Sequence, residues 1–127
     1  MNNKKIKIVY IAHPISGAVE DNIEKVKEIC KKYLDFRIFP YAPYLASLLY
    51  LDNESFRDLS LGMAINKLFF QRRFIDELWL FGDRISSGME QEIEWAFEYN
   101  IPIFAKTPET KKALKELRDK IKKKERK

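Results

Sequence analysis

Short apolar runs that alternate with longer amphipathic stretches constrain the fold of this chain most strongly. The runs cover residues 6–12, 36–39, 77–81 and 101–104, which are strand lengths. The first is rich in β-branched residues and typical of a strand buried on both faces. Apolar residues recur at helical spacing over 19–33, 55–73 and 87–99, and again from 111 onward. This order predicts an α/β fold, a single-domain Rossmann-like (flavodoxin-like) three-layer sandwich with a parallel sheet of four to five strands.

Length and composition predict one domain over residues 1–127, with a core at 6–104 and a C-terminal basic helix at 108–125. The segment 40–53 is expected to be less regular. The single cysteine, Cys30, cannot form an internal disulfide and favours a reducing compartment. No apolar run approaches the roughly 20 residues that a membrane-spanning helix needs, and the first residues do not resemble a signal peptide. We therefore expect a cytoplasmic protein with no membrane contact.

The net charge of +5 is concentrated at the C-terminal end. From Lys106 onward there are 11 basic and 4 acidic residues, out of 24 basic and 19 acidic residues in all, so the rest of the chain is slightly acidic. Such a distribution is typical of a solvated terminal helix rather than of a nucleic-acid groove, and we expect no nucleic-acid partner.

The predicted helix at 55–73 has apolar residues on more than one side, among them Leu61, Ile65 and Phe69. A helix of this kind is either deeply buried or part of a subunit interface. The second alternative predicts a homodimer or a higher homo-oligomer.

Parallel α/β sheets bind ligands beyond the carboxyl ends of their strands, which here directs attention to the loops at 13–17, 40–44 and 82–88. In the last of these, Ser86, Ser87, Gly88 and Met89 lead into a predicted helix. Free amides and the positive end of the helix dipole can hold an anion there. Ser87 with Glu90 also matches a capping box, so part of this motif has a structural role of its own.

The loop at 13–17 contributes four candidate substrate-binding residues. Pro14 and Gly17 impose an irregular backbone, while His13 and Ser16 supply hydrogen-bond donors. An ordinary strand-to-helix turn, with Ser16 near the helix cap, accounts for the same residues.

One histidine and one cysteine are too few for the usual zinc sites, so we expect no metal. The chain also lacks a Gly-x-Gly-x-x-Gly motif and a Walker loop, and we expect no dinucleotide or other cofactor.

Glu92 is less easily explained as a structural residue than Ser87 and Glu90 are. It lies beside the core stripe of Met89, Ile93 and Ala96 rather than opposite it, so its carboxyl is partly screened from water. A solvated or salt-bridged glutamate fits this spacing equally well.

Three segments together resemble the nucleoside 2-deoxyribosyltransferase-like superfamily, and above all its small bacterial, archaeal and phage branch. They are Val9-Tyr10-Ile11-Ala12-His13-Pro14-Ile15-Ser16-Gly17, Asp76-Glu77-Leu78-Trp79-Leu80-Phe81-Gly82, and Ser86-Ser87-Gly88-Met89-Glu90-Gln91-Glu92-Ile93. The resemblance implies that Glu92 attacks the anomeric carbon of a sugar, that Tyr10 orients this glutamate, and that the first loop helps to hold the nucleotide. A serine rather than an aspartate at Ser86 implies a ligand with a 5′-phosphate.

One part of the family pattern is missing. Its second catalytic acid, an aspartate before the third strand, falls here near Leu68, and Asn66 is the nearest polar residue. Asp58 and Asp83 are the candidate replacements, and Asp83 lies at the appropriate end of its strand. Loss of a general acid typically costs ~10²–10⁴ in rate. Arg57 is a candidate anion ligand, with a surface salt bridge as the alternative.

These observations lead to one main expectation and two alternatives. The main one is cleavage or transfer at the N-glycosidic bond of a (deoxy)nucleoside 5′-monophosphate or a nucleoside, through a glutamate nucleophile. The alternatives are a non-catalytic nucleotide- or nucleotide-sugar-binding module of the same fold, and a protein that acts mainly through oligomerisation.

Overall fold

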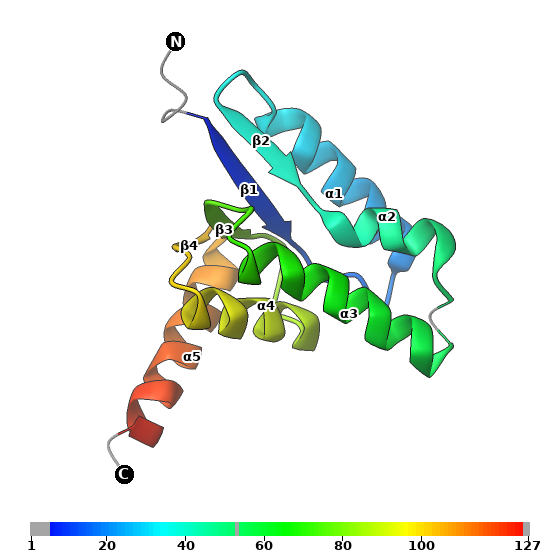
Figure 1. Ribbon diagram of the computed structural model, residues 1–127. Helices are drawn as coiled ribbons and strands as arrows, with labels where there is room; N and C mark the ends of the chain where they lie inside the picture. The colour runs from blue at the N-terminus through cyan, green and yellow to red at the C-terminus, as the bar shows by residue number, and fades with distance from the viewer. Residues whose placement is uncertain (1–5, 53, 126–127) are drawn as a thin grey trace.

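The computed structural model describes residues 6–52 and 54–125 and has an α/β architecture (Figure 1). The elements in chain order are β1 (Lys7–Ala12), α1 (Val19–Tyr33), β2 (Ile38–Tyr41), α2 (Pro43–Tyr50), α3 (Phe56–Gln71), β3 (Glu77–Leu80), α4 (Ser87–Glu98), β4 (Ile103–Ala105) and α5 (Pro108–Glu125). The four strands form one parallel sheet in the order β2-β1-β3-β4. The predicted fold class is therefore confirmed, with four strands in the described part of the chain.

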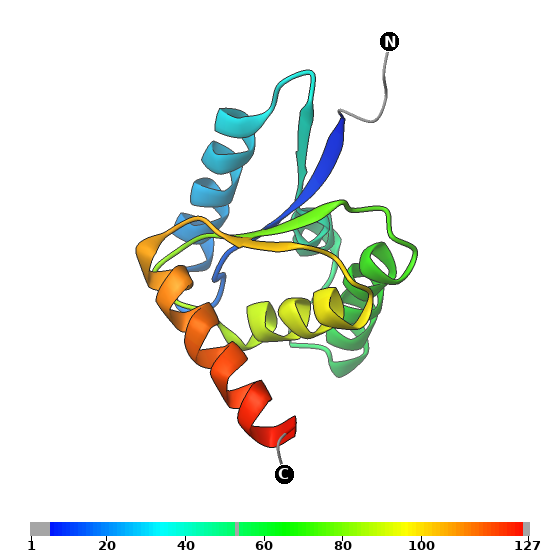
Figure 2. The ribbon, with the colours of Figure 1, turned by 90° about the vertical axis from the view of Figure 1, so that its left-hand side faces the viewer.

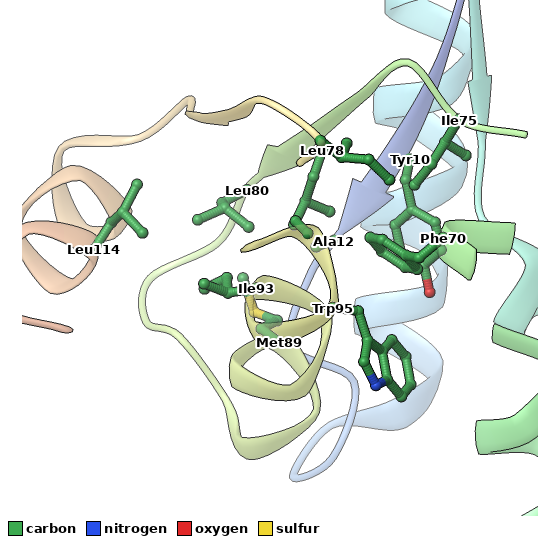
Figure 3. Close-up of a cluster of buried hydrophobic side chains, with 12 residues drawn as sticks. Tyr10, Ala12, Phe70, Ile75, Leu78, Leu80, Met89, Ile93, Trp95 and Leu114 are labelled. Carbon is green, nitrogen blue, oxygen red and sulfur yellow. The ribbon is translucent and has the colours of Figure 1, made fainter. Parts of the chain in front are cut away.

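Two hydrophobic clusters cover the two faces of the sheet, because successive side chains of a strand point to opposite sides. Val9 and Ile11 pack with Val26 of α1 on one face. Tyr10 and Ala12 pack on the other face with residues of α3, α4 and α5 (Figure 3). Figure 2 shows the resulting layers, with α1 above the sheet and α4 and α5 below it.

Three parts of the chain differ from the sequence prediction: strand β2, the segment that follows it, and strand β4. Strand β2 begins two residues later than expected and includes Pro40, which was expected to end it. Proline lacks an amide donor, and it is tolerated here because β2 is an edge strand of the sheet. The segment expected to be less regular contains helix α2, which begins at Pro43, a residue whose fixed φ suits the first helical position. Strand β4 begins two residues later than expected, after Pro102.

Helix α3 does not lie deep in the core of this chain. Phe70 is its one fully buried side chain, whereas Leu59, Leu61, Met63 and Leu68 are exposed. The first of the two alternatives for this helix is therefore wrong for the single chain.

None of the helices described here combines the length and the apolarity needed to span a bilayer.

Candidate active site

A cavity of about 560 Å³ lies beyond the carboxyl ends of β1 and β3, which is where ligands bind in parallel α/β sheets. Its walls come from the loop after β1 and from helices α2, α3 and α4. The lining residues are His13, Ile15, Ser16, Tyr44, Ser47, Leu48, Leu51, Asp58, Leu59, Gly62, Met63, Asn66, Ser86, Ser87, Gly88, Met89, Gln91, Glu92 and Trp95. The volume falls in the range of ordinary small-molecule sites.

The loop after β1 contributes two of its four predicted residues to the cavity wall. His13 and Ser16 line the cavity, and the Nδ1 atom of His13 lies 2.6 Å from the carbonyl oxygen of Pro14. Pro14 and Gly17 do not line it. Pro14 instead packs against Gly82, where an added Cβ would lie 2.5 Å from the Cδ atom of Pro14, and Gly17 has a φ of 94°. These two residues shape the loop rather than face the cavity.

The N-terminus of α4 opens on the cavity, but its capping residue differs from the prediction. Ser86 is the N-cap: its hydroxyl oxygen accepts the amide of Met89 at 3.3 Å, and its carbonyl accepts the amide of Glu90 at 2.9 Å. The predicted capping box of Ser87 with Glu90 is therefore wrong. The backbone at Ser86 is extended, with φ −77° and ψ 170°, whereas Ser87 is already helical. Only the extended residue can turn its side chain back onto the first helical amides.

Two amides of this helix end are left for a ligand. With the amides of Met89 and Glu90 occupied, those of Ser87 and Gly88 have no backbone or side-chain acceptor in the part of the chain that the structure describes. Both residues are exposed and line the cavity. Free amides at the positive end of a helix dipole form a binding site for an anion.

Glu92 presents a buried carboxyl to this cavity. Its residue is 9% exposed, and burial raises the pKa of the carboxyl from 4.5 to about 8. Burial has this effect because a low-dielectric surrounding disfavours the charged form. The group is therefore mostly protonated at neutral pH and becomes a carboxylate just above it. Clefts that contain such perturbed groups are candidates for functional sites.

Tyr10 of β1 is close enough to Glu92 for each to affect the pKa of the other. Its ring packs against that of Phe70, with centroids 4.9 Å apart, and Figure 3 shows the hydroxyl at the end of the ring that is farther from β1. This hydroxyl favours the Glu92 carboxylate and offsets part of the rise in its pKa. Among the described residues, the Tyr10 hydroxyl has no partner whose distance and angle meet those of a hydrogen bond. Burial, followed by the charge of Glu92, raises the pKa of Tyr10 well above 10, so Tyr10 stays a donor.

Helices α2 and α3 bring three polar residues to the cavity wall that sequence reasoning did not assign to the site. Tyr44 donates its hydroxyl to the carbonyl of Ile11 at 2.6 Å, which ties α2 to the end of β1. Ser47 and Asn66 also line the cavity. The Ser47 Oγ and the Asn66 Oδ1 atoms are buried and have no partner among the described residues. Because buried polar groups are normally hydrogen-bonded, these two unpaired atoms are exceptions among the residues of the cavity wall.

Three predicted residues have a different environment from the one expected. Asp58 lines the cavity, but its Oδ2 atom accepts the amide of Asp52 at 2.7 Å and its Oδ1 atom lies 3.3 Å from Nη1 of Arg57. Arg57 is exposed and does not line the cavity. Asp83 is also exposed, pairs with Arg84 at 3.1 Å, and lies outside the cavity wall. Of the two predicted replacements for the missing acid, only Asp58 borders the cavity.

The cavity wall has few charges. In residues 6–52 and 54–125, its acidic side chains are Asp58 and Glu92, and no lysine or arginine lines it. An anionic group bound here would therefore depend on the helix end for its stabilisation. No group of three or more His, Cys, Asp or Glu side chains within these ranges is arranged to hold a metal ion.

The fold and the cavity define a small parallel α/β domain with one buried carboxyl, that of Glu92, in the described part of a ligand-sized cleft. A family model described as a domain of unknown function, DUF7768, matches residues 7–106, and the chain belongs to this family. The match covers the sheet from β1 to β4 and every residue of the cavity wall. No curated protein matches the chain.

Proposed function

We propose that this protein cleaves or transfers the N-glycosidic bond of a (deoxy)nucleoside 5′-monophosphate or a nucleoside, with Glu92 as the nucleophile. The observation that carries the proposal is the buried Glu92 carboxyl at the wall of the cavity, on the same helix whose free N-terminal amides face the cavity. The resemblance of the three sequence segments to the nucleoside 2-deoxyribosyltransferase-like superfamily supports the same reaction.

In this reaction an oxygen of the Glu92 carboxylate bonds to the anomeric carbon as the bond from that carbon to the base nitrogen breaks. The electron pair leaves with the base, which takes up a proton from solvent. Water then attacks the same carbon and loses a proton to solvent as the bond from that carbon to Glu92 breaks, which releases the sugar and restores the carboxylate. A second base in place of water gives transfer instead of hydrolysis. We propose that Tyr10, whose hydroxyl has no hydrogen-bond partner among the described residues, donates to this carboxylate and orients it during the reaction.

The end of α4 provides the place for a 5′-phosphate. The amides of Ser87 and Gly88 are free to donate, and the hydroxyls of Ser86 and Ser87 add further donors. His13 and Ser16 line the cavity from the loop after β1. Asn66 and Ser47 belong to the same cavity wall.

A binding module without catalysis is the second candidate, and the surroundings of Asp58 favour it. Both oxygens of this carboxyl already have partners, and the amide of Asn66 cannot give up a proton at neutral pH. Departure of the base from such a site receives little acid assistance, which slows the reaction without weakening binding.

Base release separates the two candidates. The protein is incubated with a panel of nucleoside 5′-monophosphates and the matching nucleosides, and free base is measured by chromatography. We expect release from at least one compound, loss of release in Glu92→Gln, and unchanged release in Glu94→Gln, which alters an exposed carboxyl on the same helix. Thermal stabilisation by a nucleotide with no release of base would favour the binding module. Release that persists in Glu92→Gln would refute the proposed role of this residue.

The pH profile tests the protonation state that the proposal requires. Because the nucleophile is the carboxylate, kcat/KM rises about tenfold per pH unit below the pKa of about 8 and levels above it. A profile that falls through this range would instead identify Glu92 as a proton donor and contradict its role as nucleophile.

We further propose that the protein is a homodimer or a higher homo-oligomer that buries the apolar surface of α2 and α3. Leu49 is 88% and Phe56 85% exposed, and Leu59 and Met63 extend this surface to the cavity wall. Large exposed apolar side chains on two helices that contact each other are expected at an interface. Sedimentation equilibrium should give a multiple of the 15.1 kDa chain mass, and Phe56→Glu should reduce it. A wild-type protein that sediments as a monomer at micromolar concentration would contradict this proposal.

A further inference from the structure

A second cavity, of about 630 Å³, lies between strand β4 and helix α5 and shares no residue with the first. We call it the β4–α5 groove. It is lined by Ile103, Phe104, Ala105, Lys106, Lys111, Leu114, Lys115, Arg118, Asp119 and Lys122. Strand β4 forms the edge of the sheet opposite to β2, and Figure 2 shows that α5 follows it at this edge.

Among the described residues, the backbone of β4 is paired on one side only, by β3. The residues on either side of β4, Pro102 and Lys106, bond to β3. The carbonyl of Pro102 accepts the amide of Leu78 at 2.9 Å, and the amide of Lys106 donates to the carbonyl of Leu80 at 2.8 Å. Successive residues of a strand direct their amides and carbonyls to opposite edges. The backbone groups of Ile103 and Ala105 therefore point to the open edge, where an added strand can pair with them.

The groove carries a strong excess of positive charge. Lys111, Lys115, Arg118 and Lys122 recur at spacings of four, three and four, which places them on one face of α5. Lys106 also lines the groove, but its Nζ atom lies 4.0 Å from the centroid of the Trp79 ring, so the positive charge that faces the groove comes from α5. Asp119 is the one acidic side chain in the described wall of the groove. None of the four basic groups on α5 forms an ion pair within the described residues.

We propose that the β4–α5 groove binds an extended acidic segment of a partner protein, which pairs with the open edge of β4 while its carboxylates face the stripe of basic residues on α5. Backbone pairing and charge complementarity both point to this occupant. A nucleic acid would use the charges but not the strand edge, because its phosphates do not form a β ladder. The site is independent of the catalytic proposal, since it lies outside the first cavity.

Fluorescence anisotropy with a labelled octapeptide of alternating glutamate and valine tests the proposal on the full chain. We expect saturable binding that weakens about tenfold in the double variant Lys111→Glu, Lys115→Glu, because two attractive contacts become repulsive. The control variant, Lys112→Glu with Lys120→Glu, makes the same change in net charge at exposed positions outside the groove and should bind as the wild type does. If binding weakens equally in both variants, the effect depends on net charge alone, and the proposal that the peptide binds in the β4–α5 groove is refuted.

Two further probes separate strand pairing from charge. The same octapeptide with alternate amides N-methylated keeps its charge but cannot pair along one edge, and we expect it to bind at least about fivefold more weakly. Ala105→Pro removes an amide from the open edge, a position where proline is tolerated, and should weaken the parent peptide while the melting curve confirms a folded protein. Equal binding of the methylated peptide, or tighter binding of a ten-residue oligothymidylate than of the octapeptide, would overturn the proposal.

Discussion

Replacement of Glu92 by glutamine tests whether a buried, protonated carboxyl lies at the wall of the first cavity. Glutamine has nearly the same shape and cannot ionise. In the wild type, burial raises the pKa of this carboxyl from 4.5 to about 8. The folded protein therefore keeps a proton that the unfolded chain releases throughout this interval.

The sign and the size of the effect follow from proton linkage. Between pH 4.5 and 8 the folded state binds more protons than the unfolded state, so the free energy of unfolding falls as the pH rises. The slope reaches about 1.4 kcal/mol per pH unit, and the total loss across the interval is about 5 kcal/mol. This total is an upper value, because the carboxyl borders a cavity that admits water. It is still comparable to the whole stability of a small domain, which is about 5–15 kcal/mol.

Urea unfolding of the wild type and of Glu92→Gln at pH values from 5 to 9 measures this difference. We expect the two proteins to agree within about 1 kcal/mol at pH 5, and the variant to be more stable by roughly 2–5 kcal/mol at pH 9. Glu94→Gln, on the exposed side of α4, is the matched control and should follow the wild type. The reasoning is refuted if the wild type and Glu92→Gln have the same pH dependence.

Two backbone features give further predictions that thermal or urea unfolding can measure. Gly82→Ala should destabilise the fold by about 1–3 kcal/mol, because Gly82 has a φ of 96° and an added Cβ would lie 2.5 Å from the Cδ atom of Pro14. Gly88→Ala is the control, because the nearest atom to an added Cβ there is 4.0 Å away. An equal loss of stability in Gly88→Ala would contradict the steric reason. Ser86→Ala should cost about 1 kcal/mol of helix capping, whereas Ser87→Ala should cost little, and the reverse order would assign the cap to Ser87.

Most of the fold could be predicted from the sequence because its signals are local and repeat. A strand buried on both faces requires a short continuous apolar run, and an amphipathic helix requires apolar residues at a period of 3.6. Helix α2 was missed for a related reason. Its sequence, PYLASLLY, is apolar on nearly all sides, so it shows little period, and two prolines within four residues suggested a loop instead.

The start of α4 shows why a sequence does not fix the first residue of a helix. Two adjacent serines stand there, and the spacing to Glu90 favours Ser87 as the cap. The serine that caps the helix is the one at which the backbone changes from extended to helical. The path of the loop that connects β3 to α4 sets the position of this change. In the structure the change falls after Ser86.

The sequence by itself determined the α/β class, the position of the candidate site at the carboxyl ends of the strands, and Glu92 beside the core stripe of its helix. Only the tertiary structure decided which polar groups meet around that glutamate. Ser47 and Asn66 come from helices that reach the cavity through packing between distant segments. Ser47 does not stand out in its own sequence context, and Asn66 stands out only as the polar residue nearest the expected position of the missing acid. The tertiary structure likewise showed that Asp58, and not Asp83, borders the cavity, because the direction of a side chain after a strand depends on the turn that follows it.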